Sequence, residues 1–355
     1  NFSAGPAVLP DEALQDTAAA VVNYNDSGMS LLEMSHRSQP IVGLMEETTG
    51  LVRHLLAVPD NYQIIWLQGG ASTQFSMIPM NLLSESEIAD YTDTGSWAAK
   101  AIKEAQAYGS VNVSCSTKSS IYNFINKDLQ QSDKAIYLHV TSNNTIYGTQ
   151  WNTFPNTLNS EGYLVADMSS DIFSRTLDFN SFGLIYAGAQ KNMGPAGVTM
   201  VIIRDDILGK VDRHIPTMLD YRTHIAKGSA FNTPPVSAIF VVNRTLRWLD
   251  DLGGVKVIEE KNKMKANKLY EEIERNLLFK SPIAEKDRSL MNVPFIFSEN
   301  GNEKEFLDFC AVRGLMTLKG HRSIGGFRAS IYNAMPEAGV DALIAAMQEY
   351  ESQHS

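Results

Sequence analysis

The alternation of short apolar runs with helix-like segments is the feature that most constrains how this chain can fold. Apolar residues at helical spacing separate several of the runs, as around 97–107. Apolar runs of this length are typical of strands that are buried on both faces. Their alternation with helices predicts an α/β fold with a mainly parallel central sheet. The strand-like runs span 62–67, 87–91, 135–140, 162–166, 183–187 and 198–203.

One pair of strands is expected to break the parallel pattern. The turn Gly194–Gly197 joins the runs at 183–187 and 198–203 and is too short to contain a crossover helix. Parallel neighbours need such a crossover, whereas antiparallel neighbours can be joined by a short turn. We therefore expect these two strands to be antiparallel.

The chain is long enough for two domains, since its 355 residues exceed one typical hydrophobic core. We expect a large domain over 13–250 that holds the central sheet. A long amphipathic stretch at 237–278 leaves this sheet, and further strand-like and helix-like segments follow it. Residues 251–355 are expected to form a smaller α+β domain together with an N-terminal arm at 1–12.

The composition excludes several classes of partner. The net charge of −10 disfavours a nucleic-acid-binding protein, which needs a basic face. No apolar run approaches the roughly 20 residues that span a bilayer, and two cysteines cannot form a disulfide framework. No signal-like segment opens the sequence. We therefore expect a cytoplasmic protein without a nucleic-acid or membrane partner and without a metal site.

Lys191 and Asp167 stand at the ends of two apolar runs, at 183–186 and 163–166. The carboxyl ends of parallel strands face the crevice where α/β proteins bind ligands. A desolvated amine becomes nucleophilic toward carbonyl groups, and a carboxylate can hold a protonated ring nitrogen. The pair therefore indicates a site for an aldehyde cofactor with a basic ring. The alternatives are a lysine on a surface turn and an aspartate that caps a helix.

Two further segments fit such a site. The loop Gly69–Ser72 lies between a strand and a helix that is expected from about Thr73, and its backbone N–H groups could bind an anion. A tight turn without a ligand is the alternative. Trp97 lies near a helix start, where an indole can stack on a planar ring or anchor a core.

Two His-Arg pairs, His36-Arg37 and His321-Arg322, stand out against the acidic background, and Arg328 follows the second pair. Arginine binds carboxylate or phosphate through a planar fork, and histidine can add a donor. These residues indicate a dianionic substrate. The alternative is solvated surface charge, which explains a single arginine better than it explains two similar pairs.

Several segments together resemble the phosphoserine aminotransferases, a family of class V pyridoxal-phosphate-dependent enzymes. The resemblance covers essentially the whole chain. The segments that carry it are Asn1–Pro6, Ser35–Arg37, Gly188–Asn192, Gly194–Gly197, Phe231–Pro235, Met291–Phe295, Lys319–Arg322 and Arg328–Met335.

The resemblance implies the fold-type I architecture of pyridoxal-phosphate-dependent transferases and a homodimer with shared active sites. It implies that Lys191 forms the aldimine with pyridoxal 5'-phosphate and shuttles the proton at the substrate Cα. Asp167 would pair with the pyridine nitrogen, Trp97 would stack on the ring, and Thr145 would bind its phenolic oxygen.

The resemblance also assigns residues to the cofactor phosphate. Ala71, Ser72 and Gln190 would hold it from one subunit, and Asn232 and Thr233 would reach it from the other. Some members of the family carry an arginine where this chain has Ser72. We therefore expect backbone amides and hydroxyl groups to supply the phosphate contacts here.

The same resemblance assigns the substrate contacts. Arg328 would bind the α-carboxylate. His321 and Arg322, with His36 and Arg37 of the neighbouring subunit, would bind the distal phosphate or the γ-carboxylate of glutamate.

The implied reaction transfers the amino group of L-glutamate to 3-phosphohydroxypyruvate and gives O-phospho-L-serine and 2-oxoglutarate, a step of serine biosynthesis. The resemblance leaves open a second substrate, 4-phosphohydroxy-L-threonine of pyridoxine biosynthesis. Two alternatives also stay open: another class V transamination, of small neutral substrates, and a binding protein without catalysis.

Overall fold

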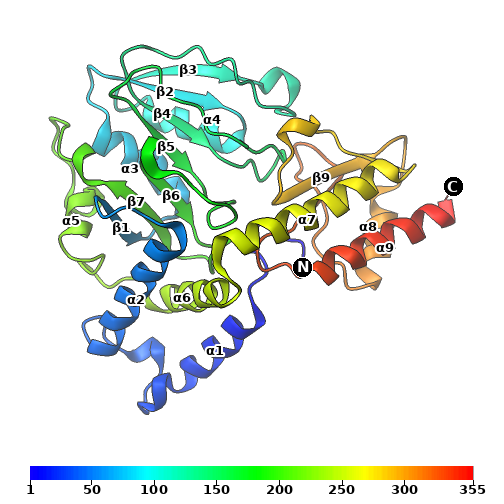
Figure 1. Ribbon diagram of the computed structural model, residues 1–355, viewed down its shortest axis with the longest axis horizontal. Helices are drawn as coiled ribbons and strands as arrows, with labels where there is room; N and C mark the ends of the chain where they lie inside the picture. Colours follow the sequence, from blue (N-terminus) through cyan, green and yellow to red (C-terminus); the bar gives the residue numbers. More distant parts are fainter. Residues whose placement is uncertain (355) are drawn as a thin grey trace.

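The computed structural model describes residues 1–354 and contains a seven-stranded sheet and a three-stranded sheet (Figure 1). The order in the larger sheet is β1-β7-β6-β5-β4-β2-β3. Its strands are β1 (Tyr62–Leu67), β2 (Ile88–Asp93), β3 (Ser110–Ser116), β4 (Ala135–Thr141), β5 (Tyr163–Asp167), β6 (Phe182–Gly188) and β7 (Thr199–Arg204).

Most neighbouring strands of the larger sheet are parallel. The pairs β2–β3, β2–β4, β4–β5 and β5–β6 are parallel, whereas β7 is antiparallel to both β6 and β1. The predicted α/β fold with a mainly parallel sheet is therefore confirmed. The predicted antiparallel pair is present as well, since the strand after the Gly194–Gly197 turn is β7.

Helices cover both faces of the larger sheet. Alternate residues of each strand point to opposite faces, so each strand contributes to two cores. Ile64 and Trp66 face the core under α2 and α6, whereas Ile65 and Leu67 face the core under α3 and α4. The helices are α1 (Asp11–Val22), α2 (Gln39–Leu56), α3 (Gly70–Leu82), α4 (Ser96–Ala105), α5 (Tyr221–Ile225), α6 (Val236–Asp251), α7 (Gly254–Arg275), α8 (Glu303–Val312) and α9 (Glu337–His354).

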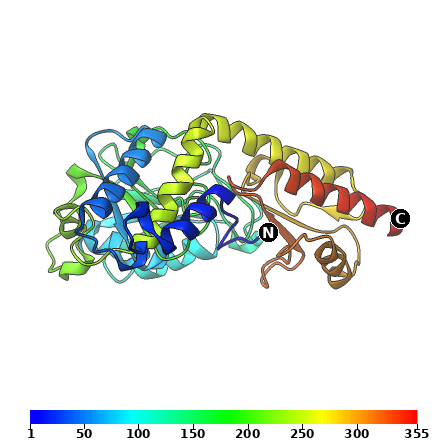
Figure 2. The same cartoon turned by 90° about the horizontal axis from the view of Figure 1, so that it is seen from below.

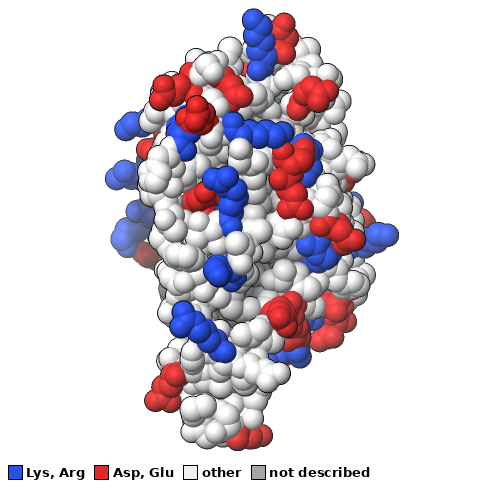
Figure 3. All heavy atoms as spheres, turned by 90° about the vertical axis from the view of Figure 1, so that its left-hand side faces the viewer, with Lys and Arg blue, Asp and Glu red and all other residues white. Residues whose placement is uncertain are grey.

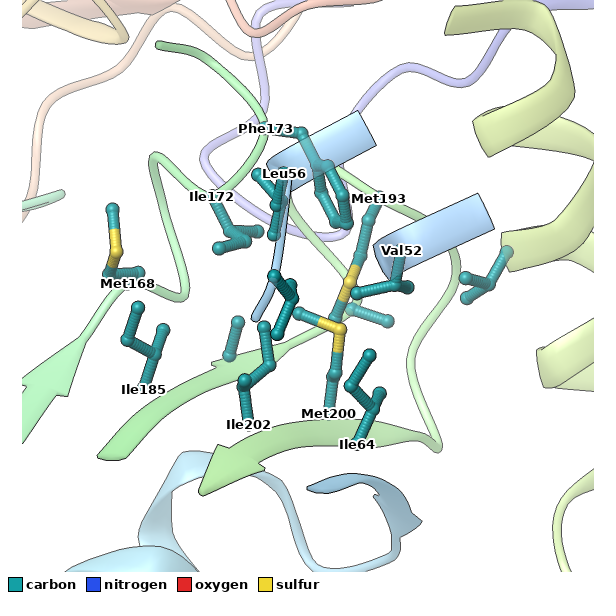
Figure 4. Close-up of a cluster of buried hydrophobic side chains, with 14 of the residues drawn as sticks. Val52, Leu56, Ile64, Met168, Ile172, Phe173, Ile185, Met193, Met200 and Ile202 are labelled. Carbon is teal, nitrogen blue, oxygen red and sulfur yellow. The ribbon is translucent and has the colours of Figure 1, made fainter. Parts of the chain in front are cut away.

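Figure 4 shows the first of these cores, between α2 and the sheet. Val52 and Leu56 of α2 pack toward Ile64 of β1 and toward Met200 and Ile202 of β7. Burying one such side chain contributes roughly 1.5–3 kcal/mol. The core therefore gives the sheet a rigid base, on which the loops at its carboxyl edge can be held in place.

The smaller sheet has the order β10-β9-β8 and is antiparallel. Its strands are β8 (Phe279–Lys280), β9 (Asn292–Phe297) and β10 (Phe327–Ser330), and α7 and α9 lie side by side along it (Figure 2). Phe2 of the N-terminal arm packs into the same core, and its N–H group donates to the carbonyl group of Met316 at 3.0 Å. These two separate cores support the division into 13–250 and 1–12 with 251–355, which stays a prediction.

The helix after β1 begins earlier than predicted. It starts at Gly70 instead of near Thr73, so the glycine segment forms its first turn. Gly69 precedes it in the left-handed region, with a φ of 94°. A Cβ atom there would lie 2.0 Å from Oγ1 of Thr73, whose hydroxyl group donates to the Gly69 carbonyl at 3.0 Å. Only glycine fits this position, which lets the helix start directly at the strand end.

Other features also differ from the sequence expectation. The amphipathic stretch at 237–278 is two helices, α6 and α7, because Gly253 adopts a φ of 106° between them. Neither β3 nor α1 was predicted. The strand β3 lies at a sheet edge with few buried residues, and α1 buries only Ala13 and Ala20, so neither has a continuous apolar pattern.

Charged side chains of both signs are interspersed on the face seen in Figure 3, which is the left-hand side of Figure 1. This face has no continuous basic surface that would suit a phosphate backbone. Within residues 1–354, no helix is long and apolar enough to cross a lipid bilayer.

Candidate cofactor and substrate site

The carboxyl edge of the larger sheet gathers four of the predicted site residues. Because β2, β4, β5 and β6 run in the same direction, the segments that follow them emerge at one edge. Trp97 follows β2, Thr145 follows β4, Asp167 ends β5, and Lys191 follows β6. Residues that are far apart in the sequence therefore converge on one region.

Lys191 is partly buried, and its amine faces Thr145 and Trp97. Its Nζ donates to Oγ1 of Thr145 at 2.7 Å and lies 5.8 Å from the centroid of the Trp97 ring. Burial lowers the pKa of Lys191 to about 8, while Asp167 opposes this shift and Arg328 adds to it. At pH 7, about 10% of such an amine is neutral, against about 0.03% of an unperturbed lysine. The alternative of an ordinary surface lysine does not fit this environment.

The loop that carries the lysine is held on both sides. Asn192 donates to the carbonyl group of Ile172 at 2.6 Å and accepts from the N–H group of Asn333 at 2.9 Å. Gly194 lies against α6, where a Cβ atom would be 2.6 Å from Cγ2 of Val242. The loop therefore has little freedom, which keeps the amine in one position.

The N-terminal arm crosses the same loop. A Cβ atom on Gly5, whose φ is 143°, would lie 3.2 Å from Cγ of Lys191. The N–H group of Ala7 donates to the carbonyl group of Gln190 at 2.9 Å. The arm thus covers the lysine, and the glycine permits this close approach.

Asp167 is buried, with 5% of its surface exposed. Its Oδ1 accepts from the N–H group of Ser169 at 3.0 Å, but none of the helices described within residues 1–354 begins there, so it is no helix cap. Burial raises the pKa of Asp167, an effect that Ser169 and the charge of Lys191 oppose. A carboxylate in such a place is stabilised by a cation, such as a protonated ring nitrogen.

Tyr186 and His139 were not singled out from the sequence, although Tyr186 lies beside Asp167 and contacts His139. Tyr186 is the register partner of Asp167 in the neighbouring strand, and its hydroxyl group lies 3.0 Å from Nε2 of His139. Burial, with a contribution from Asp167, raises the pKa of Tyr186 well above its usual value, and burial lowers the pKa of His139 to about 3. Both side chains are therefore neutral, and neither places a further charge near the carboxylate of Asp167. The sequence signal that could have identified Tyr186 was its position near the end of a strand, beside the lysine loop.

Trp97 lies in the first turn of α4 and is partly buried. Its indole Nε1 is buried and has no hydrogen-bond partner among the described residues. Gly95 precedes the helix, and a Cβ atom there would lie 2.6 Å from Oδ1 of Asn144, which is likewise without a partner. These unpaired polar atoms next to a lysine are consistent with a site that is completed by a ligand.

Arg328 reaches the same region from β10. Its Nη1 donates to the carbonyl group of Thr145 at 3.0 Å, and its buried Nε has no partner in the described part of the chain. Burial lowers the pKa of Arg328, and no carboxylate of residues 1–354 forms an ion pair with it. An unpaired guanidinium group that points at the site suits an incoming carboxylate.

His321 and Arg322 follow in the turn before β10. Nδ1 of His321 lies 2.7 Å from Oγ of Ser323, and Arg322 is exposed. Burial lowers the pKa of His321, and the charges of Arg328, Arg322 and Lys100 lower it further. The structure therefore collects positive charge on this side of the site.

The residues predicted for the cofactor phosphate lie at the start of α3. Ala71 and Ser72 belong to its first turn, whose N–H groups have no partner inside the helix. The preceding strand β1 runs in the same direction as β6, since both are antiparallel to β7. The positive end of the helix dipole therefore lies at the same edge as the lysine, which suits a phosphate.

Four predicted residues are not joined to the site within one chain. His36 is partly buried and its Nε2 has no partner among the residues that the structure describes, whereas Arg37, Asn232 and Thr233 are exposed. No hydrogen bond within residues 1–354 links any of them to Lys191. The resemblance assigns all four to the neighbouring subunit, so this single chain does not test their roles.

Comparison with known proteins gives a consistent family assignment. The family model of the class-V aminotransferases matches residues 1–343. The chain is 50% identical to a phosphoserine aminotransferase of Parabacteroides distasonis, with 100% of this chain and 99% of the relative covered. It is 44% identical, with a TM-score of 0.96, to the structure of phosphoserine aminotransferase from Bacillus circulans subsp. alkalophilus, covering 100% and 99% of the two chains. The structure of the enzyme from Trichomonas vaginalis with bound pyridoxal phosphate is 40% identical, with a TM-score of 0.93 and coverage of 98% and 99%.

Proposed function

Because the chain belongs to the phosphoserine aminotransferases of the class-V family, we propose that it transfers the amino group of L-glutamate to 3-phosphohydroxypyruvate. The products would be O-phospho-L-serine and 2-oxoglutarate. The chain is a transaminase that depends on pyridoxal phosphate. The observation that carries the proposed reaction is the amine of Lys191, poised between Thr145 and Trp97.

The residues at the sheet edge fit the cofactor. The amine of Lys191, the buried carboxylate of Asp167 and the unpaired indole of Trp97 match an aldehyde, a ring nitrogen and a planar ring, respectively. When bound, pyridoxal phosphate supplies an aldehyde that condenses with amines and a ring that withdraws electrons from the substrate Cα. The first turn of α3 with Ala71 and Ser72, together with Gln190, would hold the phosphate.

Lys191 would move the proton of the reaction. With its pKa lowered to about 8, its neutral amine can take a proton from the substrate Cα near neutral pH and return it later. The hydroxyl group of Thr145 would orient the amine, because it already accepts from Nζ. The covering arm at Gly5 limits the access of water on one side.

Asp167 would hold the positive charge of the ring. Burial disfavours its charged carboxylate when no cation is near, so pairing with the protonated ring nitrogen would stabilise the complex. Tyr186 and His139 are neutral neighbours that leave this pairing undisturbed.

The substrate would lie between Arg328 and the His321-Arg322 turn. Arg328 would bind the α-carboxylate through its unpaired guanidinium group. His321 and Arg322 would bind the distal phosphate or the γ-carboxylate of glutamate, because both are oxyanions at the far end of the substrate. In the proposed homodimer, His36 and Arg37 of the second subunit would complete this pocket, and Asn232 and Thr233 the phosphate site.

Steady-state kinetics test the substrate assignment. We expect glutamate-dependent turnover of 3-phosphohydroxypyruvate to exceed that of hydroxypyruvate by at least about 100-fold in kcat/KM, since two or three charged hydrogen bonds to the phosphate would be lost. Equal turnover, or higher turnover with alanine and glyoxylate, would point to another class V activity. Turnover of 4-phosphohydroxy-L-threonine with 2-oxoglutarate, assayed in the reverse direction, tests whether this compound is a second substrate.

A further inference from the structure

We propose that Lys100 determines specificity for the phosphorylated substrate by adding a positive charge to the distal oxyanion pocket. This inference rests on the proposed function. Lys100 lies in α4, one helical turn after Trp97, so helical spacing alone places the two side chains on one face.

The amine of Lys100 lies above the aromatic ring of the site. Its Nζ is 4.3 Å from the centroid of the Trp97 ring, whose centroid is in turn 5.8 Å from Nζ of Lys191. A cation over an indole face is held there by the ring quadrupole. Lys100 is exposed, so its charge is available to a ligand that enters beside the ring.

The substrate turn packs against the same apolar cluster as Trp97. Ile324 and Trp97 contact one apolar cluster with Tyr122 and Tyr147. The N–H group of Ile324 donates to the carbonyl group of His321 at 2.9 Å, which closes the turn. The beginning of α4 and the His-Arg turn are therefore neighbours, and the charge of Lys100 is among those that lower the pKa of His321.

The positive charges in this region lack carboxylate partners among residues 1–354. Neither Lys100 nor Arg322 forms an ion pair with a carboxylate of the described chain, 1–354. Lys268, in contrast, is bound by two carboxylates on the protein surface. Like charges that are gathered without a counter-ion repel one another, and an entering anion relieves this repulsion.

The size of the effect should follow the charge of the ligand. Coulomb energy is proportional to charge, so a phosphate dianion gains about twice as much from Lys100 as a carboxylate monoanion. If Lys100→Gln raises KM for 3-phosphohydroxypyruvate about tenfold, KM for glutamate should rise only about threefold. An additional charge of this kind would let one pocket bind both groups while favouring phosphate.

The test compares Lys100→Gln with Lys103→Gln, which removes an exposed lysine one turn further along the same helix. Each cofactor-loaded variant is assayed with glutamate and 3-phosphohydroxypyruvate, and inorganic phosphate is titrated as a competitive inhibitor. We expect Lys100→Gln to weaken phosphate inhibition about tenfold at nearly constant kcat. Lys100→Arg should restore most of the affinity, and Lys103→Gln should change neither parameter.

Two outcomes would overturn the inference. One is an unchanged KM and unchanged phosphate inhibition in Lys100→Gln. The other is a loss of bound-cofactor absorbance in that variant, which would show that Lys100 acts through the Trp97 ring. A failure of the proposed function can be told apart from a failure of this inference. In the former case the wild-type enzyme itself would not prefer 3-phosphohydroxypyruvate to hydroxypyruvate.

Discussion

Lys191, which is partly buried, and Lys265, which is buried, are two lysines with opposite surroundings. Burial lowers the pKa of Lys191 to about 8 and that of Lys265, on α7, to about 7. Nζ of Lys265 donates to the carbonyl groups of Ile331, Tyr332 and Met335, at 3.2, 2.8 and 3.0 Å. Among residues 1–354, Nζ of Lys191 makes a single hydrogen bond, to a threonine hydroxyl group.

The difference teaches that a lowered pKa does not by itself identify a reactive lysine. All three donor positions of Lys265 are used to satisfy backbone carbonyls after β10, so this side chain fastens α7 to that segment. Lys191 keeps donor positions free beside an aromatic ring and an unpaired arginine. Free hydrogen-bonding capacity, more than pKa, separates the candidate catalytic lysine from the structural one.

The largest expected effect comes from Lys191→Ala. Transamination should fall by at least about 10³-fold, because both the amine that condenses with the cofactor and the proton carrier are lost. The free energy of unfolding should change by less than about 1 kcal/mol, since one hydrogen bond is removed together with a desolvated amine. Turnover assays and urea unfolding measure these two quantities, and visible absorbance after cofactor addition shows whether the amine still condenses with the cofactor. Retained turnover would refute the assignment of Lys191.

Lys265→Met should show the reverse pattern. Three buried carbonyl groups lose their donor, which should lower the free energy of unfolding by about 3 kcal/mol. Turnover per folded molecule should be unchanged. Lys263→Met, on the same helix, removes a partly exposed lysine paired with Glu259 and Glu260, and should cost less than about 1 kcal/mol. Urea unfolding compares the two variants, and equal losses of unfolding free energy would show that Lys265 does not stabilise the contact between α7 and the segment after β10.

The rate of cofactor capture by cofactor-free enzyme should depend on pH through Lys191. A lowered pKa means that the neutral, nucleophilic amine accumulates as the pH rises toward and past about 8. The capture rate should therefore increase roughly 90-fold between pH 6 and pH 9 and then level off, because the neutral fraction grows from about 1% to about 90%. Stopped-flow absorbance measures the rate. A rate that still rises steeply above pH 10 would mean that the amine has an ordinary pKa.

The smallest effect concerns the two charges that flank this amine. Asp167 raises the pKa of Lys191 and Arg328 lowers it. Asp167→Asn should therefore move the midpoint of the capture profile to lower pH, and Arg328→Met should move it to higher pH. The same stopped-flow profiles, recorded for both variants, give the shifts. Midpoints that move in the same direction would show that the charges do not act directly on the amine.

Much of the architecture was predictable, because local patterns specify it. Apolar runs and short turns placed six of the seven strands of the larger sheet, including the antiparallel pair. The edge strand β3 and the helix α1 were missed, since exposed elements have no continuous apolar pattern. The early start of α3 was missed because it depends on the left-handed conformation of Gly69.

The candidate site was only partly predictable. Lys191 and Asp167 could be recognised at strand ends, but the contact between Lys191 and Thr145 joins residues 46 positions apart in the sequence. Lys100 and Tyr186 carry no motif of their own, and their relevance follows from what lies beside them. The contributions of a second subunit stay predictions, since one chain does not contain them.

The sequence by itself determined the fold class and the family, because periodicity and contiguous motifs are local properties. It could not distinguish Lys265 from Lys261, Lys263 and Lys268, which follow one another on the same amphipathic helix. Only the tertiary structure decided which lysine is buried against carbonyl groups and which has a free amine beside Trp97. The physical reason is that desolvation and hydrogen bonding depend on residues that the chain brings together only when it is folded.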